Sequence, residues 1–157
     1  MTGTAMNKIS ALLAGWLIPA SLLAAPAAPD RADDAVALVD LGLAYLKQHG
    51  KAALIREVNH ANPRFIRGTV YLALRGTDGT TLAHPINPRV VGKNMTVLPD
   101  ADGKYYRKEI LDIAANAGHG WVTYRYNNPA TNEIEQKATY FVRSGDLLLE
   151  AGIYKGK

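Results

Sequence analysis

The sequence predicts an α+β domain, in which one antiparallel sheet packs against a long N-terminal helix. Two observations predict this class. After residue 30, apolar residues recur at spacings of three and four, which is typical of an amphipathic helix. The end of the chain instead holds three short strand-like segments in succession, joined by turn residues, which favours an antiparallel meander. The length of 157 residues fits a single domain.

Two helices are expected at the start of the domain. Residues 30–49 begin with three aspartates, whose carboxylates favour the positive end of a helix dipole, and Gly50 follows as a typical stop. The apolar stripe of this helix consists of Val36, Val39, Leu43 and Leu46. Residues 51–59 form a second, shorter helix, which Asn62 and Pro63 end.

The rest of the chain alternates between strands and breakers. Residues 69–74 and 80–84 form two strands that a glycine-containing turn joins into a hairpin. An irregular segment with several proline residues follows over 85–99 and leads into a helix over 105–116, which a glycine-rich stop over 118–120 ends. Three further strands are expected, over residues 121–126, 136–142 and 147–154.

The first 27 residues have the pattern of a secretory signal peptide. Lys8 precedes an apolar run over 9–23, and small residues follow, which is the order of charge, apolar stretch and cleavage site that such signals share. We expect cleavage after Ala27, a mature domain over 28–157 and a periplasmic location. The alternative is an uncleaved membrane anchor, but Pro19 interrupts the run, which is shorter than the roughly 20 residues of a membrane span.

Composition excludes several classes of function. Lys and Arg number 18 against 14 Asp and Glu, and they are scattered rather than clustered, which argues against a nucleic-acid partner. Cysteine is absent, which excludes disulfides, thiolate metal sites and cysteine nucleophiles. The 4 histidines are isolated, and the chain has neither a nucleophile elbow nor a phosphate-binding loop. We therefore expect a non-enzymatic domain without metal or cofactor.

Several short motifs follow one another in a distinctive order. They are DGTTLAHP over 78–85, VGKN over 91–94, DGK over 102–104, EI over 109–110, GWVTYRYNNP over 120–129, KATY over 137–140 and GIYK over 152–155. This succession resembles the single Cache domain, the extracellular sensor module of many bacterial chemoreceptors and sensor kinases. The resemblance spans roughly residues 30–155. It implies a PAS-like fold: a five-stranded antiparallel sheet, a long N-terminal helix and a helical loop over the ligand site.

The resemblance also implies a small organic acid, such as acetate, propionate, pyruvate or lactate, as ligand. An anion needs cationic or neutral hydrogen-bond donors that converge in a concave site. Strand alternation places Val122, Tyr124 and Tyr126 on one face of their strand, with Lys137 on a neighbouring strand. The candidate ligand-binding residues are Tyr71, His84, Lys93, Tyr124, Tyr126 and Lys137, with Arg107 as a weaker candidate.

Each candidate has a defined role and a structural alternative. Lys137 would supply charge to a carboxylate, although a strand lysine is more often a solvated charge at a sheet edge. The tyrosine hydroxyls would donate hydrogen bonds, although such side chains are also typical of a core. His84 would donate a hydrogen bond, or a charge when protonated, unless it only caps a turn. A register shift of one residue would instead turn Trp121 and Arg125 toward the pocket.

The predicted function is periplasmic sensing of a short-chain organic acid. Because no signalling domain follows the sensor before Lys157, we expect a membrane-bound sensor kinase or chemoreceptor as partner. A homodimer through the N-terminal helix is a further expectation from the resemblance. The alternatives are an interaction or assembly protein of the cell envelope without a small-molecule ligand and, less favoured, a haem-binding domain.

Overall fold

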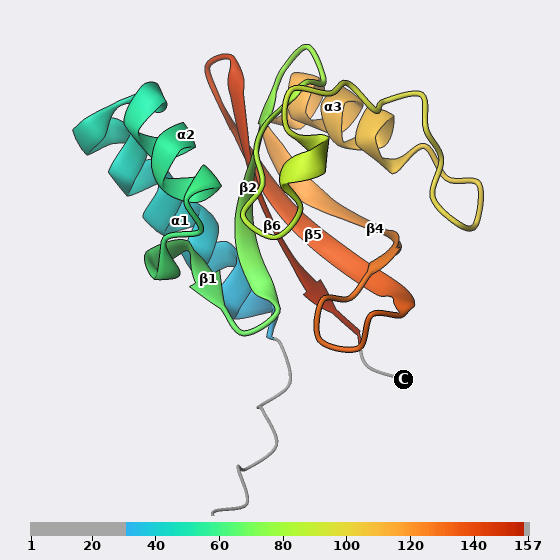
Figure 1. Ribbon diagram of the computed structural model, residues 1–157. Coiled ribbons are helices and arrows are strands. Elements are labelled where there is room, and N and C mark those ends of the chain that lie inside the picture. Colours follow the sequence, from blue (N-terminus) through green and yellow to red (C-terminus); the bar gives the residue numbers. More distant parts are fainter. Residues whose placement is uncertain (1–30, 156–157) are drawn as a thin grey trace, which may run out of the picture.

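The structure is a computed structural model that describes residues 31–155. A six-stranded antiparallel sheet forms the middle layer. Helices α1 and α2 cover one face, and helix α3 with the long loop before it covers the other (Figure 1). The predicted α+β class is confirmed. The predicted signal peptide over 1–27 lies outside the described residues and stays a prediction.

The strands lie in the order β1-β2-β6-β5-β4, and β3 pairs with β2. Their bounds are β1 Ile66–Arg67, β2 Val70–Gly76, β3 Thr81–Ala83, β4 His119–Asn127, β5 Ile134–Ser144 and β6 Leu147–Tyr154. All five predicted strands are present, and the two-residue strand β1 is an addition. Strands β4, β5 and β6 form the predicted meander, and β6 then returns to pair with β2. The C-terminal strand therefore lies inside the sheet, between β2 and β5.

The helices agree closely with the sequence patterns. Their bounds are α1 Ala32–His49, α2 Lys51–Asn59 and α3 Tyr106–Ala117, and short 3-10 turns span Pro63–Phe65 and Pro88–Val90. Helix α3 ends at Gly118, whose left-handed backbone (φ of 78°) is accessible to glycine without strain. Strand β4 starts directly afterwards, so the sequence prediction that residues 118–120 all belong to the helix stop is wrong for His119 and Gly120. None of the helices within residues 31–155 is both long and apolar enough to cross a membrane.

Two apolar cores lie on the two faces of the sheet. The first joins α1 and α2 to strands β2 and β6. Within α1 the fully buried positions are Ala35, Leu38, Val39 and Gly42, rather than the predicted stripe, of which only Val39 is fully buried. A Cβ atom at Gly42 would lie 2.7 Å from Leu72 and 2.8 Å from Leu149, so the small residues let the helix lie close to the sheet.

The second core lies on the opposite face, beneath α3. Ile110 and Ala114 of α3 pack there against Val122 of β4, Phe141 of β5 and Leu148 of β6. This core holds α3 over strands β4 and β5. The segment between β3 and α3, residues 84–105, runs over the same face and is called the covering loop below (Figure 1). A site that is enclosed by sheet, loop and helix follows from this arrangement.

Candidate ligand-binding site

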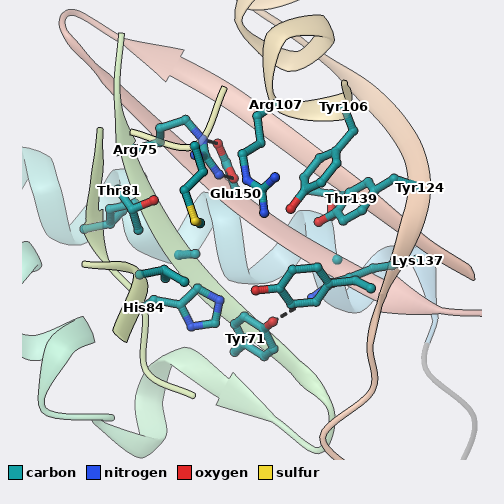
Figure 2. Close-up of a pocket in the computed structure, with 16 residues that line it drawn as sticks. Tyr71, Arg75, Thr81, His84, Tyr106, Arg107, Tyr124, Lys137, Thr139 and Glu150 are labelled. Carbon is teal, nitrogen blue, oxygen red and sulfur yellow. Dashed lines mark hydrogen bonds and ion pairs between the residues drawn. The ribbon is translucent and has the colours of Figure 1, made fainter. Parts of the chain in front are cut away.

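A pocket lies between the sheet and the two segments that cover its second face (Figure 2). Side chains from β2, β4, β5 and β6 line it on one side, while Tyr106 and Arg107 reach it from the first turn of α3. The polar lining consists of Tyr71, Arg75, Thr81, His84, Tyr106, Arg107, Tyr124, Tyr126, Lys137, Thr139 and Glu150. The inner cavity has a volume of about 30 Å³. It is therefore small and richly supplied with hydrogen-bonding groups.

Strand register explains why these side chains meet. Tyr124 lies opposite Lys137 in the β4–β5 pairing, and Lys137 lies opposite Tyr154 on β6. Two residues before Tyr154, Gly152 also lines the pocket, and a Cβ atom there would lie 2.6 Å from Cε of Lys137. The absence of a side chain at Gly152 therefore gives Lys137 room to cross β6 toward β2.

Lys137 lies at the centre of a cluster of tyrosines. It is only 3% exposed, and its Nζ donates hydrogen bonds to Oη of Tyr71 at 2.9 Å and to Oη of Tyr154 at 3.3 Å. Nζ also lies 4.1 Å from the centroid of the Tyr71 ring, within the range of a cation–π interaction. Burial raises the pKa of Tyr71 well above its ordinary value, so its hydroxyl stays protonated. The cluster holds a lysine ammonium inside the protein.

Arg75 is a second buried cation in the pocket. Its Nε and Nη2 donate to the two carboxylate oxygens of Glu150 at 2.7 and 3.0 Å, and both side chains are more than nine-tenths buried. Burial lowers the pKa of Arg75, but the Glu150 carboxylate outweighs this effect and raises it above the ordinary value. Within the described residues, the third nitrogen, Nη1, is buried and has no hydrogen-bond partner. A buried donor of this kind is costly unless it has a partner.

His84 is a neutral imidazole. Burial lowers its pKa to about 3, and the positive charges of Lys137, Arg75 and Arg107 act in the same direction. Its Nδ1 accepts a hydrogen bond of 3.0 Å from the backbone N–H of Asn87, so the proton lies on Nε2. Of the two roles predicted from the sequence, this environment favours hydrogen-bond donation over charge. Within residues 31–155, no three His, Asp or Glu side chains are arranged to hold a metal ion.

Helix α3 contributes the side of the pocket opposite the sheet. The Tyr106 ring stacks on the Tyr124 ring, with centroids 3.7 Å apart and planes 4° from parallel. The Arg107 guanidinium lies 4.2 Å from the centroid of the Tyr106 ring and points into the pocket in Figure 2. Its Nη1 donates to the carbonyl of Leu98 at 3.2 Å, which ties the covering loop to the helix. Tyr124 is held in turn by a hydrogen bond of 2.9 Å between its hydroxyl and that of Thr139.

The structure brings five of the six predicted candidates into one pocket: Tyr71, His84, Tyr124, Tyr126 and Lys137. The weaker candidate Arg107 also lines it. Lys93 does not, because its side chain is exposed while its backbone pairs with Thr81 beside β3. Ligand contact by the five remains a prediction.

Sequence reasoning missed Arg75, Glu150 and Tyr106. Alternation on β2 would have found Arg75, because it follows Tyr71 and Ala73 at a spacing of two. Glu150 could not be predicted without the strand order, which pairs Glu150 of β6 with Ala73 of β2. Tyr106 begins α3, and no periodic pattern reveals which part of the sheet the first turn of a helix will face.

A wider compartment adjoins the inner cavity on the side of the covering loop. Its volume is about 510 Å³. The two spaces share the lining residues Tyr71, His84, Val90, Met95, Tyr106, Arg107 and Tyr126. Further lining comes from the covering loop and from both strands of the β4–β5 hairpin. The inner cavity therefore adjoins a larger outer compartment.

Solved structures of other proteins share this fold. The fold matches a solved structure described as the periplasmic sensor domain of a chemotaxis protein, with a TM-score of 0.63 at 19% identity over 79% of this chain and 90% of that one. It also matches a methyl-accepting chemotaxis protein from Vibrio parahaemolyticus RIMD 2210633, with a TM-score of 0.68 at 20% identity over 78% and 86%. The fold of this chain is thus shared with both of these chemotaxis proteins.

The family follows from the sequence itself. Residues 47–146 match the model of Single Cache domain 2, and the chain belongs to this family. A third solved structure, described as the basis for carboxylic acid recognition by a Cache chemosensory domain, matches with a TM-score of 0.64 at 18% identity over 79% of this chain and 88% of that one. The resemblance and the fold predicted from the sequence are confirmed.

Proposed function

We propose that the protein is an exported sensor domain that binds a short-chain organic acid and acts through a membrane-bound signalling partner. One observation carries the proposal: three buried basic side chains, Arg75, Arg107 and Lys137, line the same small cavity. Among the described lining residues they face one acidic side chain, Glu150. Three basic groups against one carboxylate make the lining of this cavity positive, which favours a negatively charged occupant.

The donors suit a carboxylate in particular. Nη1 of Arg75 is a buried N–H donor without a partner among the described residues, and Nε2–H of His84 is a neutral donor in the same pocket. Charge-assisted hydrogen bonds from a guanidinium or ammonium to a carboxylate are about twice as strong as neutral ones. A carboxylate in the inner cavity would therefore satisfy Nη1 of Arg75 and offset the excess positive charge.

A partner outside the pocket could detect such an occupant through helix α3 and the covering loop. Arg107 and Tyr106 belong to α3, whereas Arg75 and Lys137 belong to the sheet. A ligand that bridges these groups would hold α3 and the covering loop more firmly against the sheet. A membrane receptor or kinase that contacts α3 or the loop would read this difference. Export is supported by the signal-peptide pattern over residues 1–27 and by the periplasmic neighbour in fold.

A thermal-shift experiment tests the proposal. Acetate, propionate, pyruvate and lactate are compared with acetamide and propionamide, which match two of the acids in shape but carry no charge. A ligand present at 100 times its Kd stabilises the folded state by about 2.7 kcal/mol, or roughly 5–10 °C for a domain of this size. At least one acid should raise Tm while its amide does not. If no acid raises Tm, the alternative of an assembly protein without a small-molecule ligand becomes the better account.

A further inference from the structure

We infer that the ligand is an amphipathic monocarboxylate, whose carboxylate occupies the inner cavity and whose apolar tail lies in the outer compartment. This inference rests on the proposed function and goes beyond it, because it specifies the chemistry of the part of the ligand that does not carry the charge. Its basis is the difference in size and lining between the two joined spaces.

The inner cavity holds the head of a ligand and little more. A water molecule needs roughly 10–15 Å³ of such space, so about 30 Å³ holds two waters or one carboxylate group. The buried cations Arg75 and Lys137 line this inner space and not the outer one. The charged end of the ligand is therefore expected here, and any longer part must leave through the shared boundary.

The outer compartment is larger and has a substantial apolar lining. Its volume of about 510 Å³ lies in the size range of small-molecule pockets. Its apolar lining consists of Ile86, Val90, Met95, Pro99, Ala101, Pro129 and Ile134. Because seven residues line both spaces, the tail of a ligand whose head lies in the inner cavity is expected to extend into the outer compartment.

Two of the lining residues leave apolar surface uncovered. Ile86 is 42% exposed and Ile134 is 51% exposed, and they reach the compartment from different elements, the covering loop and the start of β5. A tail that covers them gains affinity by removing apolar surface from water. Each buried methylene contributes a factor of about four in affinity.

Two charged residues, Asp100 and Arg125, line the outer compartment but not the inner cavity. Asp100 accepts backbone hydrogen bonds from Asp102, Lys104 and Arg125. Nε of Arg125 has no hydrogen-bond partner among the described residues, but it lies 3.8 Å from the Asp102 carboxylate, so its charge is partly offset. A second carboxylate at the far end of the ligand would approach Asp100 as well as Arg125. These contacts favour an apolar tail over a second acidic group.

Isothermal titration calorimetry of the purified full chain with acetate, butyrate, hexanoate and adipate tests the inference. Adipate has the six-carbon chain of hexanoate but ends in a second carboxylate. Hexanoate should bind at least about tenfold tighter than acetate and tighter than adipate. Ile134→Asn and, separately, Ile86→Asn should remove most of this gain and leave acetate affinity within about twofold of wild type.

The control is Val97→Asn, since Val97 is an exposed apolar residue of the covering loop that does not line the compartment. This variant should keep the full gain with chain length. If acetate binds as tightly as hexanoate, or adipate binds more tightly, the inference is wrong while the proposed function stands. A gain with chain length that both isoleucine variants retain also overturns it. If none of the acids binds, the proposed function itself fails.

Discussion

The Nζ of Lys137 donates a hydrogen bond of 2.9 Å to the hydroxyl of Tyr71, although the two residues lie on strands β5 and β2, which β6 separates. Gly152 of β6 makes this contact possible, because a side chain there would collide with Lys137. The ammonium is thus held over the middle of the sheet rather than at its edge. The alternative that Lys137 is a solvated charge is wrong, since the residue is buried.

Removal of the Tyr71 hydroxyl should destabilise the fold. Tyr71→Phe keeps the ring but deprives the buried ammonium of an acceptor, so the free energy of unfolding should fall by about 1–3 kcal/mol. Urea denaturation measures this change. Tyr105→Phe is the matched control, because Tyr105 is 52% exposed and should tolerate the substitution. Equal stability of both variants would show that the hydrogen bond contributes nothing.

The Arg75–Glu150 pair should behave as a unit. Glu150→Ala leaves the Arg75 charge buried without its carboxylate, which should cost about 3–5 kcal/mol of unfolding free energy. The double variant Arg75→Met/Glu150→Leu replaces both charges by apolar groups of similar size and should recover most of that loss. Chemical denaturation of the two variants checks this order. If the double variant is less stable than Glu150→Ala, the two charges do not act as a coupled pair.

His84 should make stability depend on pH in a defined direction. Its pKa is about 3 in the folded protein against 6.5 as the ordinary value, so between these values the unfolded chain binds a proton that the folded chain does not. The stability that the neutral His84 contributes to the folded protein is therefore complete above pH 6.5 and is lost as the pH falls. Between pH 7 and pH 5 the loss should reach about 2 kcal/mol.

Variants separate His84 from the other groups that titrate in this range. His84→Gln should flatten the pH dependence of the unfolding free energy between pH 7 and pH 5. His119→Gln, at an exposed histidine, should leave the dependence as it is in wild type. Urea denaturation at both pH values provides the comparison. A wild-type slope in the His84 variant would mean that other groups cause the pH dependence.

The helices and strands could be predicted because their signals are local. The spacing of apolar residues and the glycine and proline breakers place each element within a few residues. The prediction of the buried residues of α1 was less accurate. Gly42 and Ala35 lie at the contact with the sheet, and only the tertiary structure reveals such close packing. Strand alternation was sufficient for Tyr124 and Lys137, since both lie on long paired strands.

The rest of the site depends on relationships that no local pattern contains. Arg75 and Glu150 meet because β6 returns to pair with β2, and the sequence does not reveal that strand order. Lys93 lies in a loop whose path follows backbone hydrogen bonds to Thr81, so residue type alone was misleading there. Only the structure reveals the division into a charged inner cavity and a partly apolar outer compartment.

The central claim is that the buried cations recognise a carboxylate, and calorimetric titration of propionate tests it most directly. Wild type and Lys93→Ala should bind propionate with equal affinity, because Lys93 lies outside the pocket. Lys137→Ala should weaken binding by about 1.5–3 kcal/mol, the loss expected for a buried charged hydrogen bond. Equal affinity of all three proteins, or no heat of binding to wild type at saturating propionate, would contradict the account.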